Sequence, residues 1–323
     1  MSSRHPIIAV TGSSGAGTTS VRKIFEDLLQ REGVRAELVE GDSYHRYSRD
    51  EMRLAIERVE REGGRPISHF GPESNYLDLL EELFREYGER GTGRTRMYLH
   101  TQDRAAQYGQ AAGTFTAWRP IPADTDLLFY EGLHGGVVTE HVDVARHVDL
   151  LIGVAPIVNL EWIQKIHRDM ELRGYSVEAV TQTILRRMHD YVHYITPQFS
   201  RTHINFQRVP IVDTSNPFAA DGIPRPEESL LVVRFAQPET MELEGLRDNI
   251  AQQQMAVRKA KHDLAVGITA ETRRRIKSAA GNGLRGYKAG AQEHALGDSR
   301  LVVQDVHGVD DGFLASGRAG ERC

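Results

Sequence analysis

The stretch IIAVTGSSGAGTTS, residues 7–20, places a short apolar run directly before a glycine-rich turn. Residues 7–11 have the length of a buried strand. Apolar residues then recur at helical spacing, which predicts an amphipathic helix over 18–31, and Gly33 lies just past its end, where a left-handed cap is common. Residues 36–40 are typical of a second strand. This strand–helix–strand order predicts a parallel pair and an α/β sheet.

The rest of the chain to residue 235 continues the alternation. We expect helices at 50–62, 76–87, 160–170 and 177–195, strands at 126–130, 148–154, 209–213 and 230–235, and mostly loop at 100–122. Alternating strands and helices favour a doubly wound, mixed but mostly parallel sheet flanked by helices.

Composition limits the classes of function. The chain has 323 residues, 40 Lys and Arg, 45 Asp and Glu, and a net charge of −5, so no global basic field points to a nucleic-acid partner. The single cysteine, Cys323, excludes an intramolecular disulfide and favours a cytoplasmic location. There is no apolar run of about 18 residues, so we expect no membrane partner.

A change in composition near residue 236 predicts a domain boundary. Tyr287 and Phe313 are the only aromatic residues beyond it. We expect one domain over 1–236 and an atypical tail over 237–323, partly helical or disordered. The Ala/Gly/Arg-rich character of the tail would suit a frameshifted or replaced terminus.

The glycine-rich turn is close to the G-x-x-x-x-G-K-[ST] phosphate loop. Its backbone N–H groups and the following helix N-terminus would cradle phosphates, and Thr19 fills the magnesium-ligating position. Thr18 stands where lysine is usual, so either the positive charge comes from elsewhere or the loop binds no triphosphate. The alternative is a tight structural turn. The candidate nucleotide-binding residues are Gly12, Ser13, Ser14, Gly15, Ala16, Gly17, Thr18, Thr19 and Ser20.

Two carboxylates follow predicted strands, where α/β sheets place their ligands. Asp42 comes after strand 36–40 and would accept a proton from a substrate hydroxyl, with His45 and Arg49 on the same loop to hold an anionic substrate. Glu131 comes after strand 126–130 and would reach a magnesium ion. The alternatives are a helix N-cap aspartate and an ordinary acid at a strand end.

A charged cluster lies on the predicted helix 160–170. Lys165, Arg168 and Asp169 are spaced to share one face, with Arg173 just after them. Such a face would supply the cation missing at Thr18, although a solvated helix face is the common alternative. Arg186 and Arg187 form a second basic pair that could bind an anionic effector, meet a subunit or simply be solvated.

Together these stretches resemble the bacterial-type phosphoribulokinases of the P-loop kinase superfamily. The matching segments cover nearly all of 1–235: GSSGAGTTS (12–20), EGDSYHRYSR (40–49), SHFGPESN (68–75), FYEGLHG (129–135), NLEWIQKIHRDMELRGYS (159–176) and ILRRMHDYVHYITPQFSRTHINFQRVPIVDTSNPF (184–218). The resemblance implies a P-loop kinase fold and ATP- and Mg²⁺-dependent phosphorylation of D-ribulose 5-phosphate at the 1-hydroxyl. The product would be ribulose 1,5-bisphosphate, the carbon dioxide acceptor of the Calvin cycle.

The resemblance also implies roles for single residues. It makes Asp42 the base, places Lys165 and Arg168 at the transferring phosphate, and puts Glu131 or Asp169 near the metal. It assigns the sugar phosphate to three further residues, His45, Arg49 and Arg173.

Regulation is implied in the same way. Bacterial members are activated by NADH, inhibited by AMP and assembled as homo-octamers, and the positions associated with that control correspond to Arg31, Arg186, Arg187 and Arg234. The thiol pair of plant and cyanobacterial relatives is missing, and the tail after 236 does not look like the family's C-terminal region.

Two other functions stay open on the residues. A uridine- or pantothenate-type kinase would share the loop and the sheet, but His45, Arg49 and Arg173 suit a phosphorylated acceptor better. A nucleotide-binding regulator without catalysis would have no need to retain Asp42 and Lys165 together.

Overall fold

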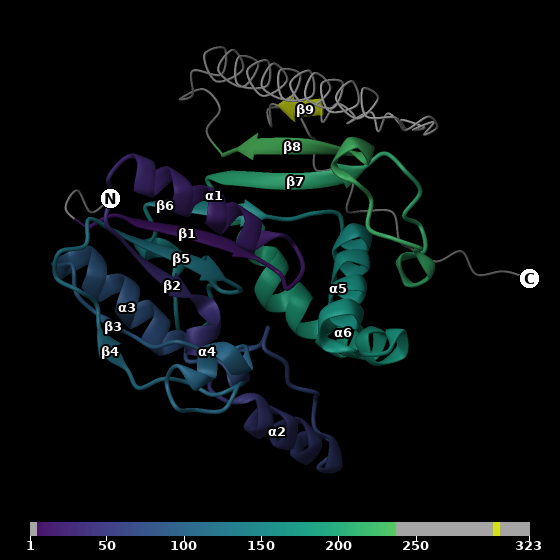
Figure 1. Ribbon diagram of the computed structural model, residues 1–323, viewed down its shortest axis with the longest axis horizontal. Coiled ribbons are helices and arrows are strands. Elements are labelled where there is room, and N and C mark those ends of the chain that lie inside the picture. The colour runs from purple at the N-terminus through teal and green to yellow at the C-terminus, as the bar shows by residue number, and fades with distance from the viewer. Residues whose placement is uncertain (1–4, 237–299, 304–323) are drawn as a thin grey trace, which may run out of the picture. The chain divides into compact units, whose positions relative to one another are not determined.

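The computed structural model describes residues 5–236 and 300–303. A seven-stranded sheet forms its centre, in the order β2-β5-β1-β6-β7-β8-β9 (Figure 1). The strands are β1 (Ile7–Gly12), β2 (Ala36–Glu40), β5 (Leu127–Gly132), β6 (Leu150–Val154), β7 (Ile204–Pro210), β8 (Ser229–Phe235) and β9 (Arg300–Val303). β7 and β8 are antiparallel and the other neighbouring pairs are parallel, which confirms the mostly parallel sheet.

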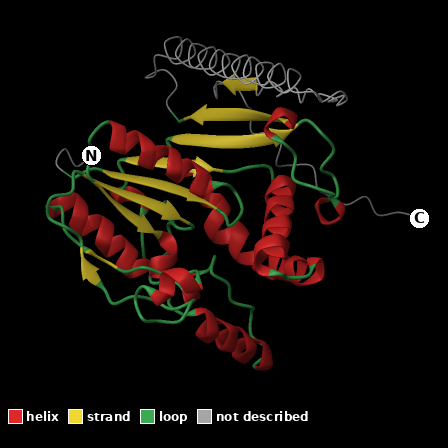
Figure 2. Cartoon of the chain, viewed as in Figure 1, coloured by secondary structure: helices red, strands yellow, loops and turns green. Residues whose placement is uncertain are grey.

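Helices and short ribbons surround this sheet (Figure 2). The α-helices are α1 (Thr18–Arg31), α2 (Arg49–Arg61), α3 (Leu77–Arg90), α4 (Gln102–Ala106), α5 (Val158–Arg173) and α6 (Val177–Asp190). A separate two-stranded ribbon pairs β3 (Arg94–Thr95) with β4 (Arg119–Pro120). None of the helices in the described ranges is long and apolar enough to cross a bilayer.

The alternation of side chains along β1 builds a core on each face of the sheet. Ile7 and Ala9 pack with the apolar face of α3, whereas Val10 packs with Phe25 and the rest of the apolar face of α1. Burying both faces explains why the central strands are apolar throughout, and it leaves their carboxyl ends as the place for a ligand.

Three differences from the predicted elements have physical causes. β1 and β2 are parallel but not neighbours, because β5 lies between them. The strand expected at 209–213 is β7 at 204–210, since the apolar residues Ile211 (64% exposed) and Val212 (41% exposed) belong to an exposed loop. The helix expected to reach 195 is α-helical only to Asp190 and continues as a π-helical turn over Tyr191–Ile195.

Most of the predicted tail lies outside the described residues. Within it the structure describes β9, which pairs in parallel with β8 from Leu230 to Val233. Residues 237–299 and 304–323 are not described.

Candidate active site

The glycine-rich turn joins β1 to α1 as predicted. Gly15 and Gly17 have φ values of 107° and 100°, a left-handed region in which side chains are strained. A Cβ on Gly15 would lie 3.3 Å from the Lys165 Cβ and 3.3 Å from the Glu161 carbonyl oxygen, so the turn lies directly against α5. The absence of a side chain at Gly15 therefore lets the turn and α5 approach each other.

α5 brings the missing cations to this turn. Lys165 Nζ donates to Asp169 Oδ2 at 2.6 Å, and Arg168 Nε donates to Asp169 Oδ1 at 3.1 Å. Arg168 Nη2 also donates to the Ser14 hydroxyl of the turn at 3.1 Å. The predicted shared helix face thus exists, and it contacts the glycine-rich turn rather than solvent.

Burial tunes the charges on α5. The Lys165 side chain is 6% exposed, and loss of hydration, aided by the positive charge of Arg187, lowers its pKa to about 8 although Asp169 opposes the shift. Burial raises the pKa of Glu161 to about 7, despite the hydrogen bond that Tyr191 donates to it at 3.1 Å. Both groups therefore titrate near neutral pH, as groups in functional sites often do.

Glu131 lies near the carboxyl end of β5, the strand between β1 and β2. It is within β5, in register with Glu40 of β2, and Arg22 of α1 lies 2.9 Å from Glu40 and 3.9 Å from Glu131. Burial raises the pKa of Glu131, while contact with the Thr18 side chain opposes the rise. Thr18 is buried, whereas Thr19 is exposed. The hydroxyl nearest to Glu131 is therefore that of Thr18.

Asp42 stands on a 3₁₀ turn (Gly41–Tyr44) at the carboxyl end of β2. Its side chain is 37% exposed, with Nε2 of His45 at 3.4 Å and Nε2 of His100 at 3.5 Å from its two oxygens. Asp42 also raises the pKa of Glu131 through its charge, so the two carboxylates face the same region. An accessible carboxylate beside the glycine-rich turn is in a position to meet an acceptor hydroxyl.

Three buried histidines near Asp42, namely His45, His69 and His134, have lowered pKa values. His45 stacks on His69 with ring centroids 4.1 Å apart, and burial lowers the pKa of both rings. Burial likewise lowers the pKa of His134 to about 4, and its Nε2 lies 2.9 Å from the Phe70 carbonyl oxygen. His45 was expected to help hold an anionic substrate. Because its pKa is lowered, at neutral pH it offers hydrogen bonds and a ring face in place of a positive charge.

Of the other two proposed sugar-phosphate residues, Arg49 and Arg173, the structure describes the side chain of Arg49. Arg49 begins α2 and donates to the carbonyl oxygen of His100 at 3.0 Å, which puts it next to the histidine that faces Asp42. Arg173 is the last residue of α5, and its side chain lies outside what the structure describes.

The four arginines expected to take part in regulation do not gather in one place within the chain. Arg31 is exposed at the end of α1, Arg234 is exposed on β8, and Arg186 lies 3.9 Å from Glu60. Arg187 instead lines a cavity of about 20 Å³ that Ser14 and Lys165 also line. Arg187 is therefore part of the candidate active site.

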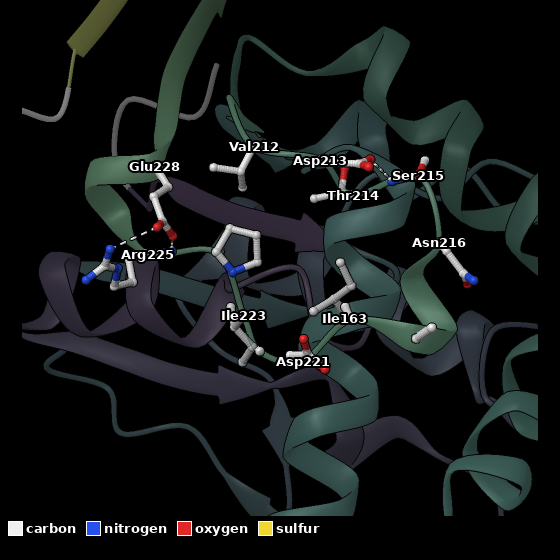
Figure 3. Close-up of a pocket in the computed structure, with 14 residues that line it drawn as sticks. Ile163, Val212, Asp213, Thr214, Ser215, Asn216, Asp221, Ile223, Arg225 and Glu228 are labelled. Carbon is white, nitrogen blue, oxygen red and sulfur yellow. Dashed lines mark hydrogen bonds and ion pairs between the residues drawn. The ribbon is translucent and has the colours of Figure 1, made fainter.

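A larger cavity of about 600 Å³ lies against α5 (Figure 3). The loop after β7 forms most of it, and Ile163 supplies the α5 side. The loop is fixed along the helix by Asn159, whose Nδ2 donates to the Thr214 carbonyl oxygen at 2.8 Å. Ile163 is two residues from Glu161 and two from Lys165, so it faces away from the glycine-rich turn. This cavity is on the other side of α5 from the phosphate loop.

Several site residues were not found from the sequence. Glu40, His69, His100, His134 and Glu161 all contact or surround the predicted residues. His100 falls in the stretch interpreted as plain loop. Two signals were available in the sequence: Glu40 lies two residues before Asp42, and Glu161 lies four residues before Lys165.

Comparisons with known proteins agree with this geometry. Residues 7–215 match the model of the "Phosphoribulokinase / Uridine kinase family". A plasmid-encoded phosphoribulokinase of Cupriavidus necator is 63% identical over 246 residues, which are 76% of this chain and 84% of that protein. A probable phosphoribulokinase of Escherichia coli is 58% identical over 246 residues, 76% of this chain and 85% of that protein.

A solved structure extends the comparison to three dimensions. The phosphoribulokinase from Rhodobacter spheroides superposes with a TM-score of 0.68 at 53% identity, over 75% of this chain and 84% of that chain. The range of the family match, 7–215, spans the glycine-rich turn, Asp42, Glu131 and α5.

Proposed function

This chain belongs to the phosphoribulokinase and uridine kinase family, and it is a kinase. We propose that it transfers the γ-phosphoryl group of ATP to the 1-hydroxyl of D-ribulose 5-phosphate, giving ribulose 1,5-bisphosphate for carbon dioxide fixation in the Calvin cycle. Relatives named phosphoribulokinase at 56–63% identity support this acceptor.

One observation carries the proposal: α5 supplies to the glycine-rich turn the charge that Thr18 cannot. Phosphoryl transfer depends mainly on positioning and on neutralising the negative charge of the phosphates. Arg168 contacts Ser14 of the turn at 3.1 Å, and Lys165 lies in the cavity that Ser14 lines. We propose that both cations meet the transferring phosphoryl group, with Asp169 fixing their direction.

On the acceptor side, Asp42 is proposed as the general base. It would take the proton of the attacking hydroxyl as the new O–P bond forms. His45, Arg49 and Arg173 are proposed to hold the sugar phosphate, His45 through hydrogen bonds and the two arginines through charge.

The residues present fit a magnesium ion. In the part of the chain that the structure describes, no three His, Cys, Asp or Glu side chains converge as a closed metal site. Mg²⁺ in kinases needs no such site, since it binds through one or two carboxylates plus substrate phosphates. Glu131, beside Thr18, meets this need, whereas Asp169 already accepts from Lys165 and Arg168. When bound, the ion would neutralise charge on the phosphates.

Regulation by NADH and AMP, and assembly as a homo-octamer in the cytoplasm, are proposed on the resemblance to bacterial members. The same resemblance supports the regulatory roles proposed for Arg31, Arg186, Arg187 and Arg234. Arg31 and Arg234 are exposed, and Arg187 lines a cavity together with Ser14 and Lys165.

The proposal is tested by identifying the product. Purified protein is incubated with ATP, Mg²⁺ and D-ribulose 5-phosphate, with and without NADH, and the product is examined by ³¹P NMR. We expect a second phosphate ester coupled to the protons at C1, and a higher rate with NADH. A phosphate ester at any other carbon would contradict the proposed acceptor position.

A further inference from the structure

Arg96, which belongs to none of the sequence motifs, donates two hydrogen bonds to the turn that carries Asp42. We infer that Arg96 is a positioning residue for phosphoryl transfer: its guanidinium holds the backbone of the turn that carries Asp42 and His45. This inference rests on the proposed function.

The guanidinium of Arg96 donates both of these hydrogen bonds to backbone carbonyl oxygens of that turn. Its Nε donates to the Ser43 carbonyl oxygen at 2.8 Å, and its Nη2 donates to the His45 carbonyl oxygen at 2.7 Å. The two carbonyls follow Asp42 by one and three residues. A planar guanidinium can reach both at once in a fixed fork geometry, which an ammonium group cannot do.

Aromatic rings hold the guanidinium itself in place. Its carbon lies 3.7 Å from the Phe115 ring centroid, 4.7 Å from that of Trp118 and 5.8 Å from that of Tyr76. Phe115 and Trp118 come from the stretch leading into β4, and Tyr76 from the residue before α3. Stacking on several rings restricts the side chain, so little entropy is lost when it donates its hydrogen bonds.

Asp42 depends on this support because little else directs its side chain. The two histidine nitrogens that face its carboxylate, from His45 and His100, lie at 3.4 and 3.5 Å, which is longer than a strong charge-assisted hydrogen bond. The direction of the carboxylate is therefore set mainly by the backbone of the turn. The same turn is fixed a second time by Tyr44, whose hydroxyl donates to the Arg94 carbonyl oxygen at 2.8 Å.

The position of the base affects the rate more than binding. A displacement of about 1 Å in a catalytic group can cost about 100-fold in rate. The hydrogen bonds and ring contacts of Arg96 go to Ser43, His45, Tyr76, Phe115 and Trp118, and these residues lie outside the glycine-rich turn and α5. Loss of its hydrogen bonds should therefore reduce kcat and leave the affinity for ATP unchanged.

The main test is Arg96→Lys, with Arg94→Lys as the matched control. Arg94 is exposed and lies two residues before Arg96, at the start of β3. We expect Arg96→Lys to lower kcat with ribulose 5-phosphate by about 10- to 100-fold. The Kd for ATP should stay within about twofold and the midpoint of thermal unfolding should stay close to that of the unmodified protein, and Arg94→Lys should match that protein in all three.

Chemical rescue separates positioning from general packing. In Arg96→Ala the ring-lined space is open, and guanidinium chloride at low millimolar concentration should restore part of the lost kcat. The same salt should not stimulate the unmodified protein or Arg94→Lys. A merely structural arginine would not be replaced by a free ion in this selective way.

The outcomes are distinct. If the unmodified protein fails to phosphorylate ribulose 5-phosphate, the proposed function fails rather than this inference. If it turns over and Arg96→Lys keeps kcat within twofold, Arg96 does not position the base. A parallel loss of kcat, ATP affinity and thermal stability, with no guanidinium rescue of Arg96→Ala, would also overturn the inference.

Discussion

The nucleotide side and the acceptor side of the site are built in different ways. On the nucleotide side, buried charges of α5 contact a glycine-rich turn, and the pKa of Lys165 is lowered to about 8 by that burial. On the acceptor side, Asp42 is partly exposed beside His45, whose pKa is lowered by burial, and Arg96 donates hydrogen bonds to the carbonyl oxygens of Ser43 and His45 in the same turn. On the proposed function, the first side would rely on charge and the second on the position of one carboxylate.

This difference predicts which substitutions separate binding from turnover. A group that neutralises phosphate charge should affect both the affinity for ATP and the rate. A group that only accepts a proton should affect the rate alone.

The largest effect is expected for Asp42→Asn. The amide cannot accept the proton, so kcat should fall by about 100- to 10,000-fold, the usual contribution of a general base. The Kd for ATP, measured by calorimetry, should change by less than twofold. Asp103→Asn, an exposed aspartate on α4, is the control and should leave kcat unchanged. An Asp42→Asn enzyme that keeps more than a tenth of the rate would remove Asp42 as the base.

Next comes the pH dependence of the nucleotide side. The pKa of Lys165 is lowered to about 8, so the ammonium is charged below that pH and loses its proton as the pH rises through it. In profiles of kcat/KM for ATP, which report the free enzyme, activity should fall above about pH 8. Lys165→Arg should move this basic limb upward, because arginine stays charged.

The control is Lys23→Arg, at an exposed lysine on α1, which should leave the basic limb in place. If Lys165→Arg leaves the basic limb of the profile where it was, the limb belongs to another group.

A smaller effect is expected from Gly15→Ala. The φ of 107° strains an alanine by about 1–3 kcal/mol, and its Cβ would meet Lys165 at 3.3 Å. The Kd for ATP should rise by about tenfold, as 1.4 kcal/mol corresponds to a factor of ten.

Gly63→Ala has the same kind of backbone strain, at φ 69°, but its Cβ would meet nothing within 4 Å. It should lower thermal stability without changing ATP affinity. Equal ATP affinities for the two variants would show that the turn does not bind phosphates.

The smallest effect is expected at His45. Burial lowers its pKa below the ordinary value, so the ring should be mostly neutral over pH 7–8 and add little titrating charge to the proposed sugar-phosphate site. His45→Gln keeps a neutral hydrogen-bonding group, and we expect the KM for ribulose 5-phosphate to rise only a few-fold. If the unmodified protein shows a pH-dependent KM over this range that is lost in His45→Gln, the histidine is charged.

Much of the nucleotide side could be predicted from the sequence, because its signals are local. The turn at 12–20 and the i, i+4 spacing of Lys165 and Asp169 are visible within a few residues, and helix geometry then fixes their neighbours. The burial of Thr18 beside Glu131 could not be predicted, since it depends on how the first turn of α1 meets β5, and the role of Thr19 as a magnesium ligand stays a prediction.

The acceptor side could not be predicted to the same depth. Arg96 and His100 lie more than fifty residues from Asp42 in the sequence, and they meet it only through the folding of a loop-rich stretch. The burial that neutralises His45 depends on His69, another distant residue. The strand order was missed for the same reason, because β5 is inserted between β1 and β2 from far along the chain.

The most direct test of the central claim is acceptor choice by the unmodified protein. ADP release is measured with ATP and Mg²⁺ in the presence of D-ribulose 5-phosphate, uridine or pantothenate, each at the same concentrations. We expect turnover with ribulose 5-phosphate and none above background with uridine or pantothenate. Faster turnover of uridine or pantothenate would contradict this expectation.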